Sequence, residues 1–364
     1  MPLALQRAWY KSGRKQPKVY EHRSREVTNL SQQPRTYNQE HIPRKYTPGK
    51  RRLSIYWSWS YPWESQRDLT EMDNRFSTMT EVRRVAWPNY ETPEWGSAQF
   101  LQGIAGTLEL FHRSALSFQK TAGEATGHPV AVYQRVDQAG YPLPIDERVL
   151  ADTDTLLVFG LDHLPGELEA STAEIEAINE WLKREGTCLL IAPHHDVGFT
   201  DDPAQRQMEY KHHGDALVPR QQRFSTYTRS LLKALNIPVT NQWGLRPALV
   251  PGTRDIAPLT AFKDLDKPGL LNNVPTLNFH PHLPHYALTN ENGTKVEVLA
   301  RQPIDPDRPH PFTAAGNKEF NCLLWFPPAG PRAGDILMVD STNFTTLFGG
   351  TESLQNFWKN LATM

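Results

Sequence analysis

Histidine is the residue type whose number and grouping in this chain are best suited to chemistry. Seven of the thirteen histidines fall into three short groups, and two of these groups also contain an aspartate. The groups are His194, His195 and Asp196; His212, His213 and Asp215; and His280, His282 and His285. Imidazole and carboxylate are ligands of first-row transition metals, and three protein ligands with one open position make a catalytic site. The first two groups therefore predict a zinc or iron site.

The histidine pattern also leaves another interpretation open. Its spacing matches no metal-binding motif, and neighbouring side chains on extended backbone point to opposite sides. We therefore expect at most one histidine of each adjacent pair to face a shared ion. In the other interpretation the histidines lie in polar loops, where they form hydrogen bonds or face solvent, and the chain holds no cofactor.

A second set of polar residues is a candidate for binding an anionic ligand. Arg220 and Arg223 precede a predicted helix whose N-terminal amides attract anions. We favour the other interpretation, in which both arginines form surface ion pairs with the acidic body of the chain. Asp340 and Ser341 follow an apolar strand, so they are placed either to line the same crevice or to cap the next loop.

The motifs of several enzyme classes are missing, and the sequence identifies no catalytic residue. Cys188 and Cys322 each fall inside an apolar, strand-like run, where a thiol acts as a small buried hydrophobe. Neither sits in a tight strand-to-helix turn, and the chain has no Gly-x-Ser-x-Gly elbow. The phosphate-binding P-loop, the dinucleotide fingerprint and the His-Glu-x-x-His zinc motif are absent as well.

One β-α-β unit positions the first histidine group. An apolar run at Thr155–Gly160 predicts a strand, residues 173–185 have the apolar spacing of an amphipathic helix, and Cys188–Pro193 predicts a second strand. Ser171 and Glu174 form a capping-box pattern at the start of the helix. Ligands of open α/β sheets bind outside the carboxyl ends of the strands, so the histidines after Pro193 are placed like a site.

The rest of the body alternates in the same way. Further strands are predicted at 53–61, 130–136, 296–301, 321–326 and Asp335–Val339, and further helices at 98–119, 224–235 and 354–361. Residues 63–96 and 196–285 are polar or proline-rich and are predicted to be insertions, the second of which is irregular outside the predicted helix at 224–235. Residues 53–364 are thus expected to form a single α/β domain with a mostly parallel sheet and helices on both faces.

Three segments carry a family resemblance. They are DTLLVFGLDHLP, STAEIEAINEWLKREGTCLLIAP and GDILMVDSTNFTTLFGGTESLQNFWKNL. They resemble the class I glutamine-amidotransferase-like domains of the gliding-motility and intraflagellar-transport group, the DUF4350 type, and more distantly the ThuA-like proteins. The family strand ends in Gly-Asp-Ser, and here Val339 stands in place of the glycine before Asp340 and Ser341. The resemblance covers about residues 150–195 and 285–364. It implies a flavodoxin-like, three-layer fold and a binding or assembly role without catalysis.

The first 52 residues differ from the rest of the chain. They hold thirteen lysines and arginines against three acids, a net charge of +10, whereas residues 53–364 carry −11. The segment is poor in aliphatic residues and has no helical or strand period, which predicts an extended basic arm. We expect the arm to dock on a protein partner or a sister subunit. A solvated tail and nucleic-acid binding are the alternatives, and no nucleic-acid module accompanies the arm.

Two hypotheses for the function follow. No run of the sequence approaches a membrane span, and none is a signal peptide, so a cytoplasmic protein is expected. The first hypothesis is a non-catalytic accessory or assembly protein that uses its amidotransferase-like domain as a binding platform and its arm to dock. The second is a metal-dependent hydrolase with a His/Asp site at the strand ends. The missing nucleophile and the arm favour the first.

Overall fold

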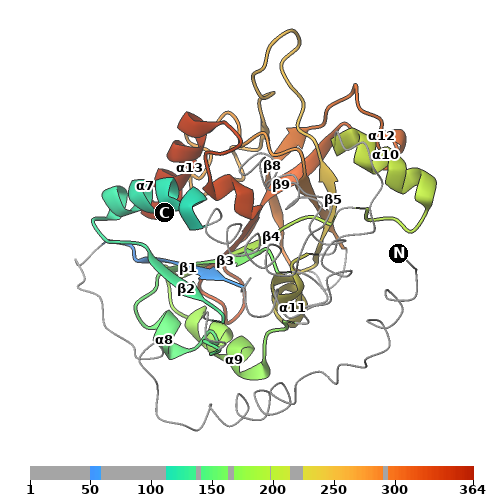
Figure 1. Ribbon diagram of the computed structural model, residues 1–364. Helices are drawn as coiled ribbons and strands as arrows, with labels where there is room; N and C mark the ends of the chain where they lie inside the picture. Colours follow the sequence, from blue (N-terminus) through green and yellow to red (C-terminus); the bar gives the residue numbers. More distant parts are fainter. Residues whose placement is uncertain are drawn as a thin grey trace, which may run out of the picture. The chain divides into compact units, whose positions relative to one another are not determined.

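The computed structural model describes residues 50–58, 112–136, 141–162, 168–196, 198–213, 224–289 and 294–364. These residues form an α/β fold built on one large, mostly parallel sheet (Figure 1). Residues 1–49 of the predicted arm, the predicted insertion at 63–96 and residues 98–111 of a predicted helix lie outside the described residues.

The large sheet has eight strands in the order β2-β1-β3-β4-β10-β9-β8-β6. Its parallel part consists of β2 (Ala131–Gln134), β1 (Leu53–Trp57), β3 (Thr155–Gly160), β4 (Cys188–Pro193) and β10 (Asp335–Val339). Its antiparallel part consists of β9 (Glu319–Phe326), β8 (Glu297–Pro303) and β6 (Thr260–Ala261). A separate antiparallel pair joins β5 (Val239–Leu245) and β7 (Leu283–Leu288).

The central strands are buried on both faces, which is why their sequences are almost continuously apolar. Every residue of β3 and of β4 is buried. Alternate residues enter different cores, since Leu157 and Phe159 belong to one apolar cluster and Leu156 and Val158 to the other. The period of two that the strand geometry imposes therefore divides one strand between two cores.

Helices contribute residues to both apolar cores. The first core includes residues of α7 (Leu116–Thr126) and α13 (Thr351–Thr363). The second includes residues of α8 (Glu147–Leu150), α9 (Thr172–Trp181) and α11 (Thr226–Ala234). The other helices of the described residues are α10 (Pro203–His213), α12 (Pro311–Ala314) and the 3-10 turn η4 (Ser341–Phe344).

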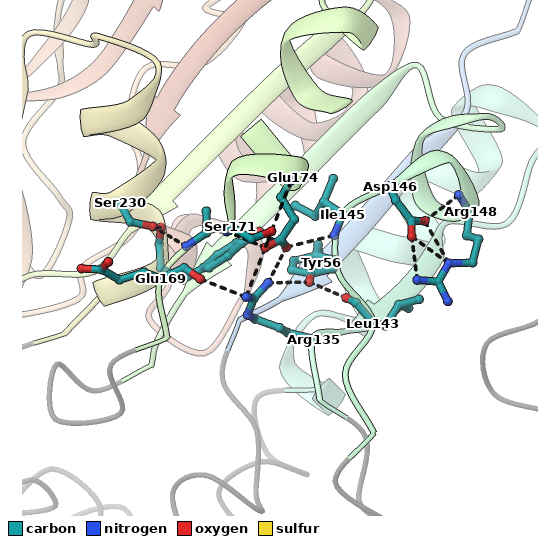
Figure 2. Close-up of polar contacts among 12 residues, drawn as sticks. Tyr56, Arg135, Leu143, Ile145, Asp146, Arg148, Glu169, Ser171, Glu174 and Ser230 are labelled. Carbon is teal, nitrogen blue, oxygen red and sulfur yellow. Dashed lines mark hydrogen bonds and ion pairs between the residues drawn. The ribbon is translucent and has the colours of Figure 1, made fainter. Parts of the chain in front are cut away.

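A buried ion pair fastens α9 to the edge of the sheet (Figure 2). Arg135, just after β2, reaches Glu174 at 2.5 Å, with the two side chains 13% and 2% exposed. The same carboxylate accepts hydrogen bonds from the backbone amide of Ser171 (2.9 Å) and the hydroxyl of Tyr227 (2.8 Å). The guanidinium lies 4.1 Å from the centre of the Tyr227 ring. A buried charge pair needs such additional partners to offset its desolvation.

The sequence predictions and the structure differ in several places. Helix α7 extends to Thr126, beyond the predicted helix end at 119, and several segments for which the sequence predicted no element have regular structure. Two of these segments are polar. The segment after His195 was expected to be irregular, but Pro203–His213 forms helix α10. No strand was predicted at β5, whose residues Val239–Leu245 pair with β7. Both elements are rich in polar residues, so their periodicity in the sequence is weak, and their regular structure depends on tertiary packing.

Candidate metal centre

The candidate site begins where two neighbouring parallel strands end. β4 and β10 are hydrogen-bonded in register, with Met338 opposite Ile191. The next polar residues on each strand are therefore brought to the same edge of the sheet. His194 Nδ1 lies 2.9 Å from Asp340 Oδ1, although 146 positions separate the two residues in the sequence.

Three buried histidines converge at this edge. His194, His195 and His280 each offer one ring nitrogen, and these three nitrogens lie within 4.8 Å of one another. The ring centres of His194 and His195 are 4.0 Å apart, and that of His280 lies 5.4 Å from His194 and 5.9 Å from His195. We call this set the three-histidine cluster. Two nitrogens that bind one zinc ion at about 2.0–2.1 Å lie at most about 4.2 Å apart, so nitrogens 4.8 Å apart would have to move closer together to hold one ion.

Another histidine and two phenylalanines surround the three-histidine cluster. The ring of His282 lies 5.0 Å from that of His195 and 5.4 Å from that of His280. Phe348 packs against His280 at 4.4 Å, and Phe224 packs against His194 at 5.5 Å. This apolar surround lowers the local dielectric, which strengthens the electrostatic interactions inside it.

Both members of the first histidine pair belong to the cluster, whereas the sequence led us to expect that at most one of them would face a shared ion. That expectation assumed an extended strand through both residues. β4 ends at Pro193, and residues 194–196 have no regular structure. Side chains alternate between opposite faces only while the strand continues.

The backbone of His194 is held by two neighbouring elements. Its amide donates to Ser225 Oγ at 2.6 Å, and its carbonyl accepts a hydrogen bond from Asn241 Nδ2. Ser225 itself donates to the carbonyl of Gly160 at 2.6 Å and has a left-handed backbone with φ of 70°. A serine in this region is strained and persists only where its surroundings hold it. The start of α11 and strand β5 thus fix the position of the His194 backbone after the end of β4.

Electrostatics favour a neutral imidazole at His280 and an ionised carboxylate at Asp340. Burial lowers the pKa of His280 to about 3, and His194 adds to the effect. Burial alone raises the pKa of Asp340, but His194 and the hydroxyl of Thr342 bring it below its ordinary value. A neutral imidazole keeps the lone pair that a metal ion needs.

Asp196 lies beside the cluster but is turned toward α11. Its Oδ1 accepts from the amide of Phe224 at 3.1 Å and lies 2.8 Å from a guanidinium nitrogen of Arg229. These contacts fix the segment that leads into α11. The convergent group of potential metal ligands among the described residues contains histidines and does not include Asp196.

His212 contacts backbone groups instead of the cluster. Its Nδ1 lies 2.8 Å from the carbonyl of Arg308, and its Nε2 accepts from the amide of Arg246 at 2.9 Å. Each ring nitrogen therefore has a backbone partner. The side chain of His213 and the whole of Asp215, Arg220 and Arg223 lie outside the described residues, so their predicted roles stay predictions.

The two remaining candidates follow β10. Asp340 caps η4 by accepting from the amide of Thr342 at 3.1 Å. Ser341 is buried, and its hydroxyl has no hydrogen-bond partner among the described residues. A ligand for this pair stays a prediction, because the described hydrogen bonds of Asp340 are with donors of the protein itself.

Both cysteines are buried in strands, as their apolar surroundings predicted. Cys188 lies in β4 and Cys322 in β9. Burial raises the pKa of Cys188 to about 12 and raises that of Cys322 further. Neither thiol ionises near neutral pH, and the thiolate is the nucleophilic form.

The comparisons with known proteins give no family. No protein-family model matches the chain, and no curated protein does. Among solved structures, one described as "mmIFT52 N-terminal domain" is similar with a TM-score of 0.38 and 9% sequence identity, over 66% of this chain and 85% of that one. A likeness this weak carries no argument about function, so the amidotransferase-like and DUF4350 resemblance stays a prediction.

Among the described residues, no helix has both the length and the apolar character that a membrane span requires. The expected cytoplasmic location stays a prediction.

Proposed function

We propose that this protein binds a zinc or iron ion through the three-histidine cluster and is a metal-dependent enzyme of hydrolytic type. One observation carries the proposal: three buried imidazoles from two distant segments place one nitrogen each within 4.8 Å of one another. Imidazole is a common ligand of transition metals, so this convergence of rings supports a shared ion.

The type of ligand narrows the choice of metal ion. Imidazole suits zinc, iron, copper and nickel, whereas magnesium and calcium prefer oxygen ligands. Three protein ligands leave a coordination position open, as in catalytic zinc sites. A metal in such a site supplies a Lewis acid and lowers the pKa of bound water to about 7. These properties support hydrolysis as the reaction type.

The strand order of the sheet supports both the location of the proposed metal site and a flavodoxin-like fold. The parallel strands run in the order β2-β1-β3-β4-β10, which corresponds to the 2-1-3-4-5 order of flavodoxin-like sheets. Helices contribute to both cores, which supports a three-layer arrangement. We therefore propose residues 53–364 as one flavodoxin-like domain with its ligand site outside the carboxyl ends of the strands.

The accessory or assembly role remains the competing proposal. It uses the domain as a binding platform and residues 1–52 to dock on a partner or sister subunit. Residues 1–49 lie outside the described part of the chain, so the structure does not bear on the arm. The convergence of the histidines favours the enzyme.

Metal content is the test. We expect tag-free protein purified without chelator to carry close to one zinc or iron per chain by inductively coupled plasma mass spectrometry. Substituting glutamine for all three cluster histidines should abolish this content. His285→Gln is the matched control: His285 belongs to the same sequence group as His280, but its ring packs on Phe312 and its Nδ1 accepts from the amide of Asn321. Metal-free parent protein that also fails to take up added zinc or iron would refute the proposal.

Hydrolysis is tested separately. The metal-loaded parent, but not the triple variant, should hydrolyse members of a panel of activated esters, amides and phosphoesters. Metal binding without turnover of any member would leave a metal-binding protein and remove the enzymatic part of the proposal.

A further inference from the structure

Asp340 is a buried carboxylate whose described ion-pair partner is a histidine of the cluster. Its side chain is 2% exposed and stands at the end of β10, beside the end of β4. Burying a carboxylate costs free energy of desolvation unless its oxygens accept hydrogen bonds. Its contacts therefore indicate what the position requires.

Each oxygen of Asp340 has its own donor. Oδ2 accepts from the backbone amide of Thr342 at 3.1 Å and from the hydroxyl of Thr342. Oδ1 lies 2.9 Å from His194 Nδ1. Because the carboxylate can only accept, the proton between Oδ1 and Nδ1 belongs to His194. In the Nδ1–H tautomer of the ring, Nε2 keeps its lone pair.

This arrangement is the one that metal-binding histidines use. A histidine ligand commonly donates its second ring nitrogen to a carboxylate, which fixes the tautomer and orients the ring. Thr342 fixes the carboxylate in turn, because its amide and hydroxyl both hold the oxygen that faces away from His194. A series of hydrogen bonds thus connects η4 to the three-histidine cluster, from Thr342 through Asp340 to His194.

We infer that Asp340 is a positioning residue of the proposed metal centre, which holds His194 as the Nδ1–H tautomer and thereby makes Nε2 its metal-binding atom. The carboxylate also places one negative charge beside three neutral ligands, which partly offsets the charge of a divalent ion. The inference rests on the proposed metal site. It replaces the expectation that Asp340 itself contacts a ligand.

The affinity test compares two aspartates, one at each end of β10. Zinc affinity is measured by competition with a chromogenic chelator for the full-length parent, Asp340→Asn and Asp335→Asn. We expect Asp340→Asn to weaken binding by about 10- to 100-fold, the usual effect of losing an outer partner of a metal ligand. Asp335→Asn should bind as the parent does, because Asp335 stands at the start of β10, where its Oδ1 accepts a hydrogen bond from the indole of Trp325 at 2.8 Å. The melting temperatures of the metal-free proteins show whether either variant has lost its fold.

A second measurement needs no variant. Nitrogen-15 NMR of the imidazoles in the metal-free parent should find His194 protonated at Nδ1, with the signal assigned through its loss in His194→Gln. Protonation at Nε2 would overturn the inference even if Asp340→Asn failed to fold.

The outcomes separate the two proposals. Parent protein that binds zinc, with Asp340→Asn binding equally well, overturns the role of Asp340 and leaves the metal site standing. Parent protein that binds no metal overturns the proposed function and this inference together. Weaker binding in Asp340→Asn with an unchanged metal-free melting temperature supports the positioning role. The loss of a purely structural residue would lower both the zinc affinity and the melting temperature.

Discussion

At the scale of single residues, the histidines of this chain are distinguished by what their ring nitrogens contact. His212 has a backbone partner at each nitrogen, so its ring acts as a cross-link between α10 and two loops. The members of the three-histidine cluster instead lie with nitrogens toward one another. Residue type and grouping in the sequence are the same in both cases, and only the fold separates the roles.

Substitutions at His280 and His282 should therefore differ in effect. His280→Gln removes a member of the cluster and should weaken zinc binding by more than the ~100-fold upper range for outer partners. His282→Gln removes a ring that only borders the cluster, so its effect should stay within that range. Chelator competition measures both. Equal losses would mean that His282 is also a ligand.

The ion pair of Arg135 and Glu174 makes a prediction about stability. Glu174→Gln leaves the buried guanidinium without its countercharge and should reduce the free energy of unfolding by about 3–5 kcal/mol. Glu180→Gln is the control in the same helix, because its pair with Lys183 is 73% and 55% exposed and should contribute less than about 1 kcal/mol. Urea denaturation measures both. Similar losses in the two variants would contradict a structural role for the buried pair.

The same pair predicts a pH dependence. Burial alone raises the pKa of Glu174, but Arg135 and two backbone amides bring it below its ordinary value. A carboxylate with a lowered folded-state pKa stabilises the protein above its unfolded-state pKa of about 4.3, and this contribution is lost as the pH falls through the folded-state value. The stability difference between parent and Glu174→Gln should thus be constant near neutral pH and shrink in acid. A difference that grows in acid would contradict this.

At the scale of elements, the sequence predicts the parallel core better than the segments that complete the site. Three strands, Thr155–Gly160, Cys188–Pro193 and Asp335–Val339, have their predicted bounds because buried parallel strands are short, continuous apolar runs. The capping box of Ser171 and Glu174 is confirmed as well. These features are local, so the sequence alone carries them.

The parts of the site that depend on long-range packing were missed. His280 was noted in a histidine group, but nothing in its irregular segment indicates that it meets β4. Ser225 and Asn241 gave no signal either, since a left-handed serine and a polar strand residue acquire their roles only from neighbours. The grouping of His280 with His282 was the one signal that pointed to a further ligand.

The turn before α13 also carries a prediction. Gly350 has φ of 68°, and a Cβ there would lie 2.5 Å from the carbonyl oxygen of Leu277. Gly350→Ala should therefore destabilise the protein by more than the ~1–2 kcal/mol that a left-handed residue costs. Gly330→Ala is the control, because Gly330 has φ of 57° but open space around it. Thermal unfolding compares the two, and equal losses would show that the turn tolerates a side chain.

At the scale of the whole molecule, the candidate centre joins segments that are far apart in the chain. His194 follows β4, His280 precedes β7, and Asp340 follows β10. An ion held by these segments binds only the folded protein, so it stabilises the fold by mass action. Metal binding and global stability are consequently linked.

Chelation should reveal this link. With free zinc at about 100 times its dissociation constant, the folded state gains about 2.7 kcal/mol. Removing the metal should lower the melting temperature of the parent, whereas the triple glutamine variant should melt at the same temperature with or without zinc. A parent protein whose melting temperature changes with neither zinc nor chelator would contradict a metal site that exists only in the native state.

The most direct test of the three-histidine cluster is an anomalous difference map from crystals of the parent protein grown with zinc, recorded on both sides of the zinc absorption edge. We predict one strong peak between the rings of His194, His195 and His280, about 2.0–2.1 Å from one nitrogen of each. A peak at other histidines, or none at the cluster in crystals that contain zinc, would contradict the metal centre proposed for this protein.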